Sequence, residues 1–359
     1  MPVLKKITLF PALLLFAAAA FAQDPMYNDT AAVPKPSVKT IRLSTSERTL
    51  SAVTTRPISG VEVVQYLWDS THIGYAQKGM MNSVVIAAPD TNATAYLQSH
   101  INSAYGHLYK QGGVQILMIV EALRIAERTG GMSEKAYLRF KGTTYGTTNG
   151  NSFVELATAD IVKNNGGMDV THKHKTNIAN AIQDLMDSTI AHLDNALAHN
   201  TAALSKEGIM NIYEAKRNIP ALKDSLVDGV YRSFEEFKTN KPSSREFDIS
   251  QQKRKILIVD KAGKPIDCWG VVKDGEVLRN LGYTVLPISK YQNGFIITKY
   301  LENARKRNSA ILWSSVAGGA IAGAIVGKTV QLVNADAFPD LTPLPNGTAI
   351  DMETGAFIF

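Results

Sequence analysis

Three apolar segments decide the fold of this chain: VQILMIVEALRIA (114–126), KAYLRFKGTTYGT (135–147) and SFVELATADIV (152–162). Turn-forming sequences rich in Gly and Asn separate them. From Ala136 to Lys141, apolar residues alternate with tyrosine or charged ones, as in a half-buried strand. The first segment fits a helix pattern as well as a strand pattern, and we assign it to a strand. Together the three segments predict an antiparallel meander.

Periodic segments on both sides of the meander predict helices that pack on it. Apolar residues recur at spacings of three and four over 92–110, where Asn92 is a suitable N-cap, and again over 175–197. Short β-branched runs at 61–68 and 83–88 predict two more strands. Residues 41–200 are therefore expected to form an α+β domain, in which helices pack on the antiparallel meander.

The rest of the chain predicts a connector and a smaller β-rich domain. In the connector, 201–243, the residues Tyr231, Phe234 and Phe237 have the spacing of one helical face. Residues 244–359 carry the features of the β-rich domain. Its expected strands are 256–259, 266–272, 284–288 and 295–299, and its expected terminal hairpin is 350–359.

The amino terminus has the features of a secretory signal peptide. Lys5 and Lys6 precede an apolar run, and Ala20-Phe21-Ala22 forms a small-x-small cleavage site. We expect cleavage after Ala22, followed by a flexible leader at 23–40. The mature protein is then exported, and it is periplasmic or associated with the outer membrane.

The composition of the chain excludes one class of partner and one kind of covalent cross-link. The formal net charge of +6 is small and spread along the chain, so no nucleic-acid partner is expected. Hydrophobic residues make up 45% of the chain, which is enough to form the hydrophobic cores of folded domains. Cys268 is the single cysteine, so it cannot form an intrachain disulfide. We interpret it as a small buried hydrophobic residue.

Five stretches carry a resemblance to a known group of proteins: WDSTHIGY (68–75), MSEKAYLRFK (132–141), GGMDVTHKH (166–174), GVYRSFEEFKTNKPS (229–243) and DMETG (351–355). They resemble exported proteins of unknown function from Bacteroides-type Gram-negative bacteria. This resemblance implies a cell-envelope setting and brings no catalytic residues. The order of elements in the first domain is also similar to that of envelope accessory proteins of lipid transporters.

Residues 310–327, AILWSSVAGGAIAGAIVG, form an uncharged stretch in which Gly319, Gly323 and Gly327 recur every four residues. In a helix these glycines form one stripe, which is typical of close backbone contact between helices. The cations at 305–307 oppose a simple inner-membrane span after a cleaved signal. Outer-membrane association, self-association, a membrane-inserting hairpin and a buried glycine-rich segment remain open.

One cluster of residues has the chemistry of a metal site. His172, His174 and Asp169 lie close together in the sequence, although a polar helix entry is the alternative interpretation that we favour. Glu127 and Glu134 are interpreted as strand-end charges on a solvated face. The chain has no HExxH motif, and the sequence GMSEK (131–135) lacks the second glycine of a nucleophile elbow.

These features favour a non-catalytic exported envelope protein that requires no cofactor and associates with membrane or with itself through 310–327. Two alternatives remain open. One is a periplasmic metal-dependent hydrolase that uses the His172, His174 and Asp169 cluster. The other is an accessory component of an envelope lipid-transport system.

Overall fold

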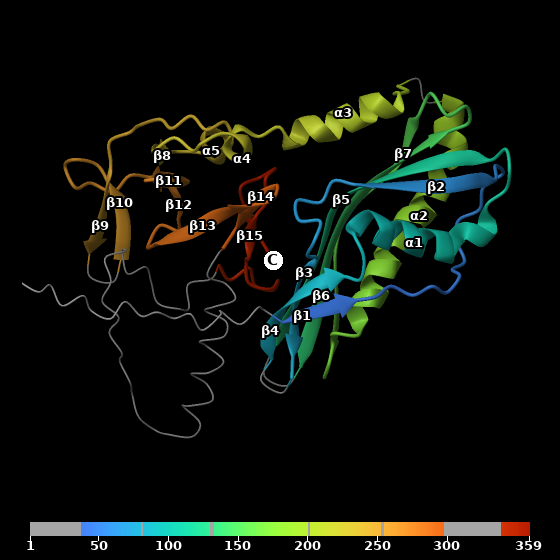
Figure 1. Ribbon diagram of the computed structural model, residues 1–359, viewed down its shortest axis with the longest axis horizontal. Coiled ribbons are helices and arrows are strands. Elements are labelled where there is room, and N and C mark those ends of the chain that lie inside the picture. Colours follow the sequence, from blue (N-terminus) through green and yellow to red (C-terminus); the bar gives the residue numbers. More distant parts are fainter. Residues whose placement is uncertain (1–36, 80–81, 130–132, 200–201, 253–254, 298–338) are drawn as a thin grey trace, which may run out of the picture. The chain divides into compact units, whose positions relative to one another are not determined.

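The three long strands that the sequence predicts form the centre of the fold: β5 (Val114–Thr129), β6 (Glu134–Thr147) and β7 (Val154–Gly167). They pair antiparallel in sequence order, which confirms the meander (Figure 1). The computed structural model describes residues 37–79, 82–129, 133–199, 202–252, 255–297 and 339–359. Residues 37–359 belong to one unit of the chain.

Strand β5 has a continuous apolar pattern because both of its faces are covered. Ile116 and Met118 belong to the cluster beneath helices α1 and α2, whereas Leu117 and Ile119 belong to a cluster that contains Ile209 of α3. A strand buried on both faces shows no alternation of polar and apolar residues. This is why the sequence of this segment fits a helix as well as a strand.

Four shorter strands complete a seven-stranded sheet on the other edge of β5. Strand β2 (Ile58–Gln65) pairs parallel with the first half of β5, and β3 (Gly74–Lys78) pairs parallel with it at Gly74 and Ile125. Strand β4 (Ser83–Pro89) pairs antiparallel with β3 and parallel with β1 (Val38–Ile41). Strands β1 and β3 were not predicted, and β1 lies mostly within the expected leader.

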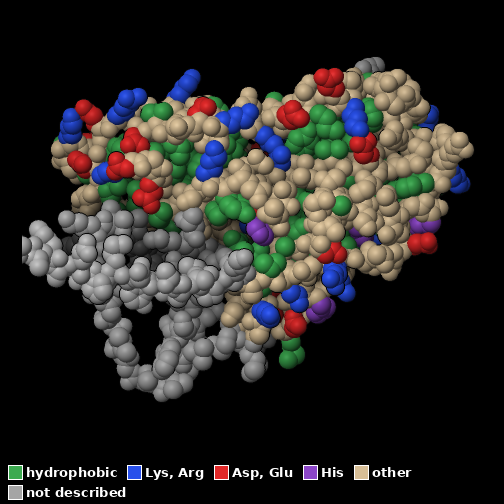
Figure 2. All heavy atoms as spheres, viewed as in Figure 1, with side chains coloured by type: hydrophobic (Ala, Val, Ile, Leu, Met, Phe, Trp, Pro, Cys, Tyr) green, Lys and Arg blue, Asp and Glu red, His purple; other side chains and the backbone are tan. Residues whose placement is uncertain are grey.

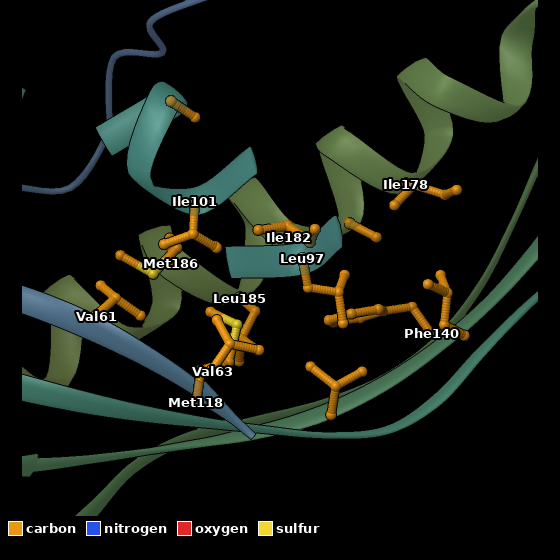
Figure 3. Packing of buried hydrophobic residues seen from close by; sticks show 14 of the residues in the cluster. Val61, Val63, Leu97, Ile101, Met118, Phe140, Ile178, Ile182, Leu185 and Met186 are labelled. Carbon is orange, nitrogen blue, oxygen red and sulfur yellow. The ribbon is translucent and has the colours of Figure 1, made fainter. Parts of the chain in front are cut away.

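Two helices cover one face of this sheet. Helix α1 (Ala93–Tyr105) is capped by Asn92, whose side chain accepts a hydrogen bond from the Ala95 N–H, and a 3-10 turn, η1 (Gly106–Leu108), follows it. Helix α2 (Lys173–His199) crosses the meander. Figure 3 shows the shared core, which contains Leu97 and Ile101 of α1, Leu185 of α2 and Phe140 of β6. The predicted helices are confirmed.

Two further helices follow the first sheet. Helix α3 (Lys206–Arg217) begins at Ser205, whose hydroxyl accepts from the Gly208 N–H. It packs on the face of the first sheet opposite to α1 and α2, where Tyr213 joins Leu117 and Tyr145. Helix α4 (Pro220–Lys223) is a single turn.

The second sheet is fully antiparallel and has seven strands, in the order β16-β15-β14-β13-β12-β11-β8. Its strands are β8 (Gly229–Tyr231), β11 (Gly270–Lys273), β12 (Glu276–Asn280), β13 (Val285–Tyr291), β14 (Gly294–Ile296), β15 (Ala349–Ile350) and β16 (Phe357–Ile358). A separate hairpin of β9 (Asp248–Gln252) and β10 (Lys255–Val259) packs near it. The chain is therefore α+β, with a meander and helices followed by a smaller β-rich part.

One aromatic segment of the connector folds differently from its prediction. Tyr231 ends strand β8, and only Phe234 and Phe237 lie in helix α5 (Phe234–Lys238). Ser233 separates the two elements because its side chain accepts from the Glu236 N–H and so caps α5. Tyr231 still packs against Phe237, with ring centroids 5.5 Å apart. The three aromatic residues therefore share a core without sharing a helix.

The stretch 310–327, with Gly319, Gly323 and Gly327, lies outside the described residues, as do the predicted signal sequence and residues 23–36 of the predicted leader. Within the described residues, the structure contains no helix with the length and apolar character needed to cross a bilayer.

Candidate functional site: a charged cleft between the two sheets

A row of basic side chains lies on the meander face that α1 and α2 do not cover. Arg124 of β5 is directly opposite Arg139 of β6, and Lys141 follows two residues later on the same face. The structure therefore confirms the alternation predicted for β6. Its apolar side chains, such as Phe140, join the core under α2, and its basic side chains face the second sheet.

Acidic side chains from the end of the chain meet this basic row. A guanidinium nitrogen of Arg139 lies 3.1 Å from a carboxylate oxygen of Asp351, and the Lys141 ammonium lies 2.8 Å from Glu353. Both acids belong to the turn between β15 and β16. The DMETG stretch therefore joins the second sheet to the meander through two ion pairs.

Arg124 is the most deeply buried cation of the row, with 4% of its surface exposed. Its Nε donates to the Phe359 O atom and one Nη donates to the Thr348 hydroxyl. The guanidinium carbon lies 4.6 Å from the centroid of the Trp68 ring, within the range of a cation–π contact. Arg124 thus links strand β5 to the residue before β15 and to the residue after β16.

The basic row and the DMETG acids border a cleft, here called the first cavity, with a volume of about 120 Å³. Tyr66 and Tyr213 form one aromatic wall, with stacked rings whose centroids are 5.3 Å apart. Other non-polar side chains of the lining are Trp68, Ala122, Ile219, Ile350, Met352 and Ile358. The cleft therefore combines apolar walls with charged groups.

Two cations at the end of helix α3 also line the first cavity. The Lys216 ammonium lies 2.8 Å from Glu121 and 4.7 Å from the Tyr213 ring centroid. The Arg217 guanidinium lies 4.9 Å from the Tyr66 ring centroid and donates to the Leu67 carbonyl. Burial lowers the pKa of Arg217 from its usual value, because desolvation disfavours the charged form.

The cations of the cleft do not continue a uniformly basic surface. On the face shown in Figure 2, Lys and Arg side chains are interspersed with Asp and Glu side chains. The described lining of the first cavity, in contrast, carries five cationic side chains and three carboxylates. The lining of the cleft therefore carries an excess of positive charge.

A second cavity of about 140 Å³ adjoins the first, since Trp68 and Arg124 line both. The loop that follows β2 supplies Asp69 and His72, and β13 supplies Tyr291. The Nδ1 atom of His72 lies 3.2 Å from Asp69 Oδ2 and 3.1 Å from the Tyr291 hydroxyl. This network comes from the WDSTHIGY stretch and from a residue more than 200 positions away.

Asp69 is the anchor of this network. Its Oδ1 accepts hydrogen bonds from the backbone N–H groups of Thr71 and His72 and from the Gln292 side chain. Burial acts to raise the pKa of Asp69, but the hydrogen bonds from His72 and Thr71 outweigh it and hold the pKa below its usual value. The loop and strand β13 are therefore connected through an ionised, well-bonded carboxylate.

The three residues of the predicted metal cluster differ in their exposure. His172 and Asp169 are exposed, whereas His174 is buried in the first turn of α2. The Asp169 carboxylate accepts from the Thr171 N–H. Over the described part of the chain, no group of three or more His, Cys, Asp or Glu side chains is placed to hold a metal ion.

The partner of His174 is a residue that the sequence interpretation placed on a solvated face. Glu127 lies inside the protein, with its side chain fully buried, and its Oε1 is 2.8 Å from His174 Nε2. The placement predicted for Glu127 is wrong because it follows Leu123 and Ile125 on the helix-covered face of β5. Helix α2 covers it, and no feature of the local sequence indicates that cover.

Comparison with known proteins leaves the family of this chain open. No protein-family model matches the chain, and no curated protein sequence matches it. A crystal structure of a Xanthomonas campestris protein of family DUF330 is similar over 50% of this chain and 98% of its own length, with 9% identity and a TM-score of 0.26. A likeness at that score carries no inference about function.

Proposed function

We propose that this chain is an exported, non-catalytic protein of the cell envelope that binds a small, partly apolar ligand in the first cavity. The observation that carries the proposal is the wall of that cavity, where the stacked rings of Tyr66 and Tyr213 lie among aliphatic side chains. Concave sites with mostly apolar walls and a few polar groups are typical of small-molecule binding.

The size of the cavity limits the ligand. An engineered protein cavity of roughly 150 Å³ accepts a benzene molecule, and the first cavity measures about 120 Å³. It therefore accommodates one ring or a short chain, or the corresponding part of a larger molecule. A complete two-chain lipid does not fit inside it.

The bonding of the charged residues supports binding rather than catalysis. Lys141 lies in ion pairs with Glu121 and Glu353, and Arg139 lies in ion pairs with Asp160 and Asp351. The pairs with Asp351 and Glu353 join the two sheets, and all four pairs occupy groups that would act as acids or bases. The described lining of the first cavity includes no Ser, Cys or His.

A neutral fluorescent probe tests the proposed function. N-phenyl-1-naphthylamine brightens in apolar surroundings, and its phenyl ring alone has the size that the first cavity accommodates. Its fluorescence therefore reports occupancy of the cavity by that ring without testing charge. Ala122 lines the cavity, and Ala122→Leu fills part of it, which should weaken probe binding by about tenfold, or 1.4 kcal/mol. Ala95 is an exposed residue of α1, so Ala95→Leu is the matched control. Equal probe affinity in both variants and the wild type would refute the proposal.

Export and surface association are the remaining parts of the proposal, and both rest on the sequence. Cleavage after Ala22 predicts that the protein recovered from the periplasm or outer membrane begins at Gln23. Association through 310–327 predicts that Gly323→Leu moves protein from the membrane fraction, or from an oligomer, into the monomeric soluble fraction. A wild-type protein that is fully soluble and monomeric after a salt wash would contradict the association.

A further inference from the structure

We propose that the ligand of the first cavity carries an anionic group, a phosphate, carboxylate or sulfonate, that pairs with the guanidinium of Arg217. This inference rests on the proposed function and specifies the chemistry of the ligand. The argument depends on how Arg217 is held, on the distribution of charge around it and on the apolar surface beside it.

Arg217 is held in one pose by two contacts outside its own helix. One Nη atom donates to the Leu67 carbonyl, and the guanidinium carbon lies over the Tyr66 ring, 4.9 Å from its centroid. Arginine presents five N–H donors in a planar fork, so these contacts leave other donors available on the same group. A cation that is already oriented loses little conformational entropy when it binds an anion.

The charges around Arg217 are distributed unevenly. The three carboxylates of the described lining are engaged elsewhere: Glu121 with Lys216, Asp351 with Arg139, and Glu353 with Lys141. Among the residues that the structure describes, no carboxylate oxygen lies within ion-pair distance of Arg217. A partly buried cation without an anion is unfavourable, and a bound anion removes that cost.

The helix end alone offers a simpler explanation for a cation at this position. Arg217 is the last residue of α3, where positive charge interacts favourably with the helix dipole. Lys216 is in the same turn, however, and it pairs with Glu121. The dipole also does not require Arg217 to stack on Tyr66 and to contact the backbone of another segment. The lowered pKa of Arg217, caused by burial, agrees with a charge that lacks compensation.

The apolar wall specifies the rest of the ligand. Because Arg217 lies at the Tyr66 and Tyr213 wall, an anionic group bound to it places an attached ring or short chain against aromatic and aliphatic side chains. Phenyl phosphate has this combination of groups. Inorganic phosphate has only the anion, and benzyl alcohol has only the neutral ring, so the three probes separate the two parts of the site.

Calorimetric titration of the purified protein with these probes tests the inference. We expect phenyl phosphate to bind at least tenfold more tightly than benzyl alcohol, and its affinity to fall with increasing salt. Arg217→Gln should weaken phenyl phosphate about tenfold and leave benzyl alcohol unchanged, whereas Arg217→Lys, which keeps the charge, should restore part of the affinity. Arg42, whose side chain is 80% exposed, supplies the matched control Arg42→Gln.

The outcomes separate this inference from the proposed function. If benzyl alcohol binds and phenyl phosphate binds no more tightly, or if Arg217→Gln leaves phenyl phosphate unchanged, the anion site is refuted and the apolar cavity stands. Equal affinity for inorganic and phenyl phosphate would uphold the anion site and contradict an apolar ligand. If no probe binds the wild type, both proposals fail. Circular dichroism of each variant establishes that it is folded.

Discussion

The buried pair of Glu127 and His174 should stabilise the attachment of helix α2 to the first sheet. The two side chains have no exposed surface, and Glu127 Oε1 lies 2.8 Å from His174 Nε2. The second carboxylate oxygen accepts from the Gln77 N–H of strand β3 at 2.7 Å. One carboxylate therefore joins three elements, β3, β5 and α2, that lie apart in the sequence.

The loss of stability on breaking the pair depends on which polar groups remain buried without a partner. His174→Leu leaves the Glu127 carboxylate with only the Gln77 N–H, and a buried charge that loses its partner costs about 3–5 kcal/mol. The double substitution Glu127→Leu with His174→Leu removes both polar side chains and leaves only the Gln77 N–H without its acceptor, at about 1–3 kcal/mol. The double variant should therefore be more stable than the single variant His174→Leu.

Equilibrium unfolding in urea, followed by far-ultraviolet circular dichroism, measures this difference. The matched control is Asp184→Ala, which removes the exposed ion pair between Lys163 of β7 and α2, and it should cost less than about 1 kcal/mol. If His174→Leu lowers the free energy of unfolding by no more than the control, or if the two losses at Glu127 and His174 simply add, the reasoning about this pair is wrong.

Three further predictions follow from single residues. Gly74 has a φ of +122°, and a Cβ there would overlap the Ile125 carbonyl oxygen. Gly74→Ala should therefore lower the free energy of unfolding, measured by thermal unfolding, by roughly 3 kcal/mol or more. Gly60→Ala should lower it far less, because no atom lies near the added Cβ. The pKa of Asp69 is lower in the folded protein than its unfolded value of about 3.9. The carboxylate therefore contributes its full stabilisation of the fold above the unfolded pKa, and this contribution is lost as the pH falls through the folded pKa. In Asp69→Asn, the free energy of unfolding should consequently fall less steeply as the pH is lowered. Burial raises the pKa of the Cys268 thiol to about 11, so iodoacetamide at pH 8 should modify native protein far more slowly than urea-unfolded protein.

Each of these three has a contradicting result. Equal melting temperatures for the Gly74 and Gly60 variants would show that the backbone around Ile125 adapts. If Asp69→Asn leaves the pH dependence of the free energy of unfolding unchanged at acidic pH, the carboxylate is equally ionised in the folded and unfolded states. Equal modification rates for native and unfolded protein would show that Cys268 is not protected.

Much of the local structure could be predicted because it depends on neighbouring residues. The alternation in β6, the periodicity of α1 and α2, and the Asn92 cap are properties of short windows, and the structure contains all of them. The terminal hairpin around DMETG was also predicted and is present as β15 and β16. The buried position of Cys268, at 8% exposure, agrees with its interpretation as a small hydrophobic residue.

The sequence by itself therefore determined the class of the fold, the central meander and most helix positions, since hydrophobic periodicity and capping act over a few residues. Only the tertiary structure decided where Glu127 lies, that both faces of β5 are covered, and that Asp351 and Glu353 meet Arg139 and Lys141 at a cleft. The physical reason is that burial and pairing of charge depend on which distant segment covers a surface. Residues more than 200 positions apart form the cleft, and no local pattern encodes that contact.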